Sequence, residues 1–153
     1  MREIGLKDQD KFVCMIVRDG AYLDNASGSY AYHNYRDSDI DSYKKAIKIK
    51  PDYADAYNNL GAVLKDKGDL EAAIGSCKQA LKIKPNYLEA FINMGNALHA
   101  KGELEAAIDS YKQALKINPN QADAYNNMGN VLQDKGDLEV AIDNYKQALK
   151  INP

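Results

Sequence analysis

Asparagine side chains recur at regular places along this 153-residue chain. One place repeats every 34 residues, and a second place lies three residues after it in two of the copies. An amide both donates and accepts hydrogen bonds, so an evenly spaced row of amides can hold the backbone of an extended peptide with little regard to its side chains. Asparagine is also a mediocre helix former, so its repetition on helices needs a reason. We call the following residues the asparagine ladder: Asn58, Asn59, Asn93, Asn96, Asn126, Asn127 and Asn130.

Three acidic residues near position 40 raise the question of a metal site. Asp37, Asp39 and Asp41 alternate as at the start of a calcium-binding loop. That loop needs glycine at its sixth place and glutamate at its twelfth, where this chain has Ser42 and Lys48. An Asp-x-Asp site of the glycosyltransferase type has no strand leading into it here. We therefore interpret the three acids as solvated residues at the start of a helix.

The histidines and cysteines form no catalytic or metal-binding pattern. His33 and His99 have no cysteine, serine or second histidine at a useful spacing, so we interpret both as solvated. Cys77 falls on an apolar helical stripe, which predicts a buried and inert thiol. We expect no catalytic residue, no cofactor and no metal, and hence a protein that is not an enzyme.

The 34-residue repeat predicts the helices on which the ladder lies. All four prolines, Pro51, Pro85, Pro119 and Pro153, lie 34 residues apart, and a period of this length indicates an array of structural units. Apolar residues at helical spacing predict two helices in each unit. An asparagine or aspartate three residues before an acid predicts the N-caps of the first helices at Asp52, Asn86 and Asn120. A glycine in the left-handed conformation should end each first helix, at Gly68, Gly102 and Gly136.

Glycine also recurs inside the first helix of each unit. A glycine there costs about 1 kcal/mol relative to alanine, so its return in three copies predicts close packing of the two helices. The glycines are Gly61, Gly95 and Gly129. The small residues expected opposite them are Ala73, Ala107 and Ala141.

This pattern resembles the tetratricopeptide repeat family. The family's ordered positions are held in the first copy by Tyr57, Leu60, Gly61, Leu64, Ala73, Cys77, Ala80 and Pro85. The other two copies match as well, with Tyr111 and Tyr145 in the place of Cys77. The resemblance implies an all-α, right-handed superhelix whose first helices line a concave groove, and it places the asparagine ladder in that groove. The ladder is similar to that in the superhelix of O-linked N-acetylglucosamine transferases.

Two alternatives to peptide binding stay open for the ladder. The amides could merely solvate an open groove, or they could record the recent duplication of one unit, because duplication copies every residue. If the groove is open, replacing Asn59, Asn93 and Asn127 by alanine should leave the fold stable and weaken binding.

The repeat divides the chain into five parts. Residues 1–36 are an atypical segment, 37–53 are half a repeat containing only a second helix, and the three full repeats are 54–87, 88–121 and 122–153. This predicts seven helices from residue 37 onward. In the first part, Lys11 to Arg18 has the apolar run of a buried strand, with Ser29 to Tyr35 as its possible partner; a helix or irregular structure is the alternative. Residues 8–43 also show a weaker resemblance to part of a bacterial glycosyltransferase family, so a glycosyltransferase fragment is the alternative function.

Composition narrows the class of partner. The net charge of −2 comes from interspersed signs, which offers no basic face for nucleic acid. The longest apolar run, from Phe12 to Val17, is too short to span a bilayer, and no secretory signal is evident, so we expect a cytoplasmic protein with no membrane partner. The expected partner is a protein or peptide.

Charge and hydrophobicity add two expectations about that partner. A carboxylate clamp of the kind found in the resembled family needs cations in the groove, whereas the equivalent places hold Asp55, Glu89 and Asp123. These acids favour a ligand with basic residues. The last helix has an uncovered apolar stripe, Leu138, Ile142, Tyr145 and Leu149. We expect either that a second copy of the chain covers it, giving homo-oligomers, or that the chain is a piece of a longer array.

Overall fold

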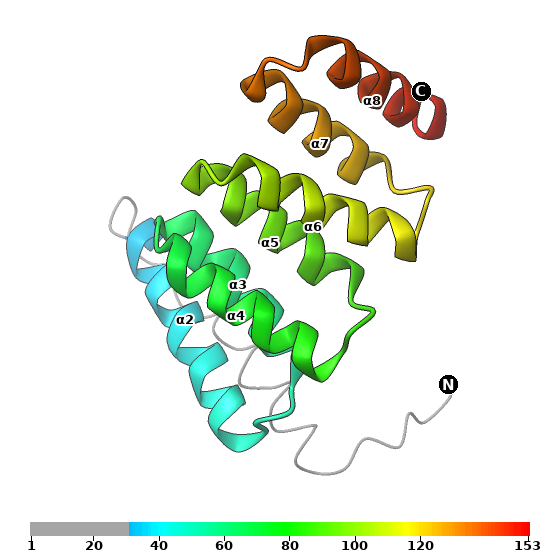
Figure 1. Ribbon diagram of the computed structural model, residues 1–153. Coiled ribbons are helices and arrows are strands. Elements are labelled where there is room, and N and C mark those ends of the chain that lie inside the picture. The colour runs from blue at the N-terminus through cyan, green and yellow to red at the C-terminus, as the bar shows by residue number, and fades with distance from the viewer. Residues whose placement is uncertain (1–30) are drawn as a thin grey trace.

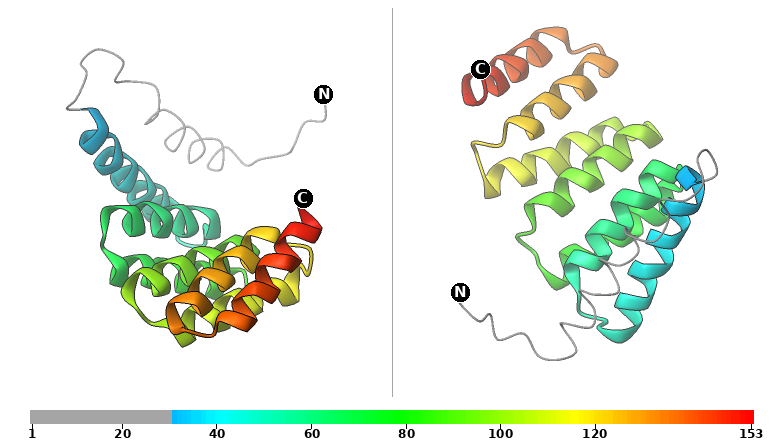
Figure 2. Two further views of the ribbon diagram at one scale, coloured as in Figure 1. Left: turned by 90° about the horizontal axis from the view of Figure 1, so that it is seen from above. Right: turned by 180° about the vertical axis from the view of Figure 1, so that it is seen from behind.

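The chain folds into a stack of helical hairpins (Figure 1). The computed structural model describes residues 31–153, and within this range it has helices and no strand. The helices are α2 (Ala31–Ile49), α3 (Ala54–Lys67), α4 (Leu70–Ile83), α5 (Leu88–Lys101), α6 (Leu104–Ile117), α7 (Ala122–Lys135) and α8 (Leu138–Ile151). Three antiparallel hairpins, α3–α4, α5–α6 and α7–α8, follow one another in chain order, and α2 packs against α3 (Figure 2). The predicted all-α superhelix is confirmed.

The contacts between hairpins show which helices lie on the inner side of the stack. The first helices of neighbouring hairpins touch, since α3 contacts α5 and α5 contacts α7. Over residues 31–153, no such contact joins α4 to α6 or α6 to α8. Helices on the tightly curved side of a stack must approach one another, and helices on the outer side spread apart. The first helices therefore line the concave side, as predicted.

The N-terminal part of this region differs from the prediction. Helix α2 begins at Ala31, six residues before the expected start of the half repeat at residue 37. Residues 31–35 are therefore helical, and the idea that they pair with a strand is wrong. No proline or glycine lies between Ala31 and Ile49, so no residue terminates the helix earlier. The expected strand from Lys11 to Arg18, and most of the region resembling a glycosyltransferase, lie outside the described residues.

The early start of α2 also changes the place of the three acids near position 40. Asp37, Asp39 and Asp41 lie in the body of the helix, whose first turn contains no acid. Their interpretation as residues at the start of a helix is therefore wrong. Partial burial raises the pKa of the Asp39 carboxyl, whereas Asp41 is exposed.

The ends of the first helices are closed as predicted. Gly68, Gly102 and Gly136 adopt left-handed φ values of 88°, 84° and 94°. In the first hairpin, the Asp69 amide donates to the Leu64 carbonyl at 2.9 Å, across five residues, and the Gly68 amide donates to Lys65 at 2.9 Å. This pair of hydrogen bonds satisfies carbonyls that the helix end would leave unpaired.

The predicted N-caps at Asp52, Asn86 and Asn120 are wrong. Each first helix begins one residue later than predicted, and the N-cap residues are Tyr53, Tyr87 and Gln121, none of which makes a side-chain capping bond. At α5 packing between repeats accounts for the difference, because Tyr87 is only 7% exposed and its hydroxyl donates to Asp55 Oδ1 of the preceding repeat at 2.6 Å. Among the second helices, Asp69 does cap α4 by accepting from the Ala72 amide at 3.3 Å.

The helical glycines make room for a side chain from the second helix. A Cβ atom on Gly95 would lie 2.6 Å from Tyr111 Cε1, and one on Gly129 would lie 2.6 Å from Tyr145 Cε1. In the first repeat, the nearest atom is the sulfur of Cys77, at 2.7 Å from a Cβ on Gly61. Close packing is confirmed, but the ring or sulfur comes nearest, and the predicted alanine positions are not the closest neighbours.

Candidate functional site

All seven ladder asparagines lie on the first helices of the hairpins. Asn58 and Asn59 are on α3, Asn93 and Asn96 on α5, and Asn126, Asn127 and Asn130 on α7. Their exposure differs: Asn58 is 6% exposed, whereas Asn126 and Asn130 are open to solvent. The remaining four are partly buried. The ladder thus combines amides packed between repeats with amides at the surface.

Amide hydrogen bonds connect the ladder from one repeat to the next. Asn93 Nδ2 donates to Asn58 Oδ1 at 2.9 Å, and Asn58 Nδ2 approaches Asn59 Oδ1 at 3.4 Å. One repeat further on, Asn127 Nδ2 donates to Asn96 Oδ1 at 3.1 Å. Asn93 and Asn127 therefore contribute to the contact between hairpins. This changes the expectation that their replacement by alanine would leave stability untouched.

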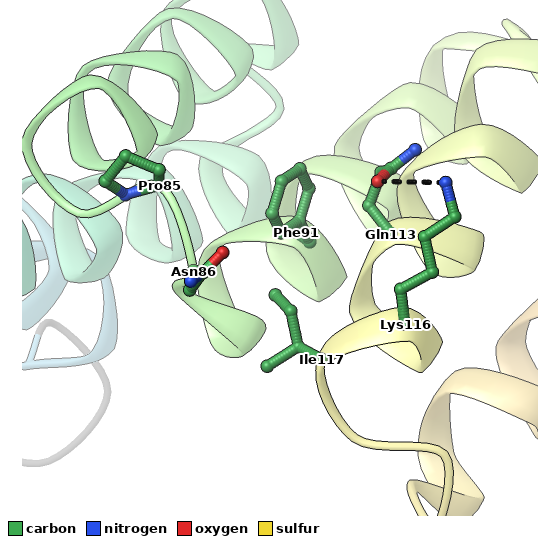
Figure 3. A pocket seen from close by; sticks show the side chains of 6 residues that line it. All are labelled: Pro85, Asn86, Phe91, Gln113, Lys116 and Ile117. Carbon is green, nitrogen blue, oxygen red and sulfur yellow. Dashed lines mark hydrogen bonds between the residues drawn. The ribbon is translucent and has the colours of Figure 1, made fainter.

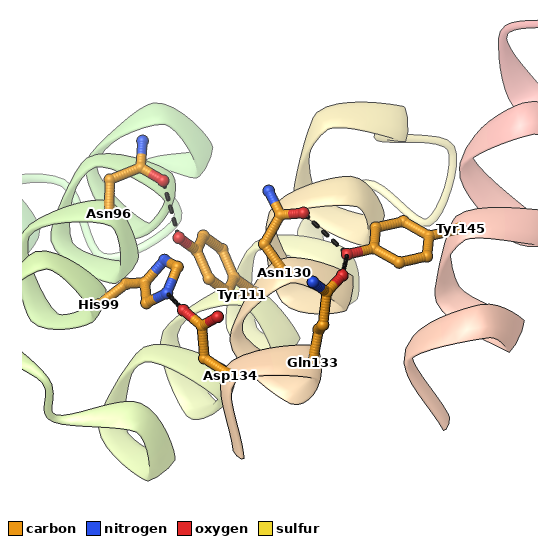
Figure 4. Close-up of polar contacts among 7 residues, drawn as sticks. All are labelled: Asn96, His99, Tyr111, Asn130, Gln133, Asp134 and Tyr145. Atoms are coloured by element: carbon orange, nitrogen blue, oxygen red, sulfur yellow. Dashed lines mark hydrogen bonds and ion pairs between the residues drawn. The ribbon is translucent and has the colours of Figure 1, made fainter. Parts of the chain in front are cut away.

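Two tyrosines of the second helices donate hydrogen bonds to ladder asparagines on the first helices. Tyr111 donates its hydroxyl hydrogen to Asn96 Oδ1 at 2.7 Å, and Tyr145 donates to Asn130 Oδ1 at 2.8 Å (Figure 4). The Tyr145 hydroxyl also lies 3.1 Å from Gln133 Oε1. Sequence reasoning treated these tyrosines only as family positions. A signal was present nonetheless: the first repeat has Cys77 in place of the tyrosine and Ala62 in place of the asparagine, so the two partners occur together and are absent together.

Burial sets the protonation of Tyr111 and Cys77, which lie on the second helices. Tyr111 is fully buried, and this burial raises the pKa of its phenol. Cys77 is also fully buried, which raises the pKa of its thiol to about 11. The prediction of a buried, unreactive thiol is confirmed. Both groups stay protonated at neutral pH.

His99 has a partner that sequence spacing did not reveal. Its Nε2 lies 2.7 Å from Asp134 Oδ2, so the pair joins α5 to α7 beside the ladder (Figure 4). The interpretation of His99 as simply solvated is wrong, because its carboxylate partner comes from the next repeat. The histidine and aspartate side chains are 27% and 58% exposed.

Each first helix carries one acidic residue near its start, Asp55, Glu89 or Asp123. Glu89 and Asp123 are exposed, and Asp55 accepts the hydrogen bond from Tyr87. Burial, followed by the hydrogen bond and charge of Asp55, raises the pKa of the Tyr87 phenol.

A pocket of about 460 Å³ lies away from the ladder, where the α4–α5 connection meets the end of α6 (Figure 3). Its lining consists of Pro85, Asn86, Phe91, Gln113, Lys116 and Ile117. Lys116 is the one ionisable group among these six, so the lining contains no acid–base pair and no nucleophile beside a base. Among residues 39–153, no three His, Cys, Asp or Glu side chains are grouped to hold a metal ion. None of the helices described is long and apolar enough to cross a membrane.

Comparison with known families accounts for the repeat. A tetratricopeptide repeat model matches residues 54–87 and 122–153, and a second TPR repeat model matches residues 40–67 and 95–136. The chain belongs to the tetratricopeptide repeat (TPR) family. The three TPR hairpins are those that carry the asparagine ladder. Among curated protein sequences, none matches the chain.

Solved structures show the same fold. A crystal structure of MamA is 25% identical with a TM-score of 0.76, over 91% of this chain and 77% of MamA. A thermophilic TPR protein of Thermus thermophilus is 24% identical with a TM-score of 0.75, over 92% and 74% of the two chains. The first TPR of Spaghetti (RPAP3), bound to the HSP90 peptide SRMEEVD, is 21% identical with a TM-score of 0.70, over 82% and 94%.

Proposed function

We propose that this TPR chain is a non-catalytic scaffold that binds an extended protein or peptide segment along the concave side of α3, α5 and α7. The observation that carries the proposal is the row of amides on three successive first helices, several of which keep hydrogen-bonding atoms without a partner in the described region. Such atoms can bind the N–H and C=O groups of a peptide backbone. The Spaghetti TPR, which has the same fold, binds an HSP90 peptide, and this supports a peptide-binding role.

The acids beside the ladder define the ligand further. We infer that the bound segment carries basic residues, because Glu89 and Asp123 are exposed carboxylates on the same helices. A ligand ending in acidic residues would meet like charge there and should bind less well.

Asn126 provides a direct test of the proposed function. It is exposed and makes no side-chain hydrogen bond with the rest of residues 39–153, so Asn126→Ala should not affect the fold. Peptides are first selected on the wild-type protein from a random display library, and their affinity is measured by fluorescence polarisation. We expect Asn126→Ala to lower the affinity for these peptides by about two- to tenfold, which corresponds to the loss of one hydrogen bond. Lys112→Ala on the outer helix α6 is the control, and equal affinity for both variants would contradict binding of the peptide at Asn126 on α7.

The last helix suggests a second copy of the chain as a further partner. Leu138, Val140, Ile142 and Leu149 of α8 are 50% to 63% exposed. The equivalents of Ile142 in the earlier repeats, Ile74 and Ile108, are each 5% exposed because the following hairpin packs onto them. We propose that two copies associate through this face about a two-fold axis, so that each copy covers the apolar residues of the other.

A further inference from the structure

The donors and acceptors of the ladder have a fixed arrangement in the second and third repeats. Asn96 Oδ1 accepts hydrogen bonds from Tyr111 at 2.7 Å and from Asn127 Nδ2 at 3.1 Å. Two bonds use both lone pairs of an amide oxygen. The two N–H groups of Asn96 Nδ2 therefore have no hydrogen-bond partner among residues 39–153.

Asn130 repeats the arrangement one hairpin later. Its Oδ1 accepts from Tyr145 at 2.8 Å, and its Nδ2 has no partner among residues 39–153. Figure 4 shows the nitrogens of Asn96 and Asn130 both pointing away from the tyrosines. The first repeat cannot do the same, because Ala62 and Cys77 stand at the two places.

In Asn93 and Asn127 the amide is used the other way round, with the nitrogen hydrogen-bonded and the oxygen left over. Each uses one Nδ2 hydrogen to reach the preceding repeat, and the Oδ1 of each has no partner in the described region. Concave-side amides thus offer N–H donors at one repeat position and carbonyl acceptors at the other. A residue in an extended peptide exposes its own N–H and C=O on the same edge, which is the complementary pattern.

The tyrosine hydroxyl decides this polarity. The amides of Asn96 and Asn127 could reverse together, with Asn96 donating to Asn127, and their mutual hydrogen bond would be kept. That reversal would turn the Asn96 nitrogen toward Tyr111 and leave the phenolic hydrogen without an acceptor. Because Tyr111 is fully buried, its hydrogen cannot bond to water instead. Only the observed orientation satisfies all three groups.

We propose that Tyr111 is a positioning residue that holds the amide of Asn96 with the nitrogen toward the ligand. Tyr145 acts on Asn130 in the same way but less strictly, because its single hydrogen can also be donated to Gln133 Oε1. The second and third repeats then bind carbonyl oxygens of an extended backbone, while the oxygens of Asn93 and Asn127 accept from its N–H groups. This inference rests on the proposed function and deepens it by specifying which amide atom meets which backbone group. An amide oriented in advance loses less freedom on binding, so these two repeats contribute most of the affinity.

The test uses Tyr111→Phe and Tyr145→Phe, which remove the hydroxyl and keep the ring against Gly95 and Gly129. Tyr125→Phe is the matched control, because Phe91 naturally occupies the equivalent place in the middle repeat. The probe is a blocked, uncharged peptide of alternating serine and threonine, long enough to lie across the three first helices. Nitrogen relaxation of the asparagine side chains is measured by NMR with and without the probe.

We expect the probe to shift the Nδ2 resonances of Asn96 and Asn130 in the wild-type protein. Each positioning variant should bind the probe peptide about two- to tenfold more weakly than the wild type, whereas the Tyr125→Phe control should bind it equally well. The variants should also make the facing asparagine amide more mobile before any peptide is added. The same peptide N-methylated along one edge should fail to bind.

Each contrary result has a separate meaning. Unchanged amide mobility in both positioning variants would overturn the role of the tyrosines, whatever the ligand does. If mobility changes but the probe shifts no ladder resonance, the tyrosines orient the amides and the proposed backbone binding is wrong. If both positioning variants melt earlier yet bind the probe as tightly as the control, the hydroxyls serve only the fold.

Discussion

Two glycines should respond in opposite directions to the same substitution by alanine. Gly75 lies in the middle of α4, is exposed, and a Cβ atom there would meet no atom within 4 Å. Gly95 lies in the middle of α5, and a Cβ there would come within 2.6 Å of the Tyr111 ring. Both positions gain the higher helix propensity of alanine, so packing alone decides the difference between them.

The magnitudes follow from these environments. Gly75→Ala should stabilise the protein by about 0.5 to 1 kcal/mol, because helix propensity is the only effect. Gly95→Ala gains a similar amount but must displace a ring that is fully buried, and overpacking of this kind costs about 1 to 3 kcal/mol. The net result for Gly95→Ala is a loss of up to about 2 kcal/mol. At this chain length, 1 kcal/mol corresponds to a shift of roughly 2 to 4 °C in Tm.

Urea denaturation monitored by circular dichroism measures both variants against the wild type. A further control repeats Gly95→Ala in a Tyr111→Leu background, where the smaller side chain at 111 should make the same substitution less costly than in the wild type. The reasoning fails if Gly75→Ala is destabilising, or if Gly95→Ala is more stable than the wild type. Either outcome would mean that the helices approach each other differently from the distances given above.

Three more expectations concern the repeats and their surfaces. Asn93→Ala and Asn127→Ala should each lower the free energy of unfolding by about 0.5 to 1.5 kcal/mol, since each removes a hydrogen bond between repeats; unchanged urea midpoints would show that these bonds add nothing. Concentration-dependent sedimentation should reveal dimers that Ile142→Glu abolishes, and a monomer at every concentration would refute association through α8. Cys77 should resist thiol reagents in the folded protein: its pKa is raised to about 11 from an ordinary value of 9.0, so its contribution to stability is complete below pH 9.0 and is lost as the pH rises through 11. Rapid labelling under native conditions would contradict this.

The amino-acid sequence by itself determined the unit of this protein. The 34-residue spacing of the prolines, the apolar stripes and the turn glycines predicted three hairpins and a preceding single helix, all of which the structure contains. These features depend on neighbours within one turn or one hairpin. Gly68 illustrates this, because its left-handed backbone is required by the end of the helix on which it lies.

Tertiary structure alone decided how one repeat meets the next. At α5 the predicted cap was wrong because Tyr87, the actual N-cap residue, is buried and donates to Asp55 of the preceding repeat. Likewise, the partner of Asn93 is Asn58 and that of His99 is Asp134, each 35 residues away. The offset between neighbouring hairpins sets these pairs, and it results from the packing of whole helices. A single repeat therefore contains no information about which side chains of the next repeat it will reach.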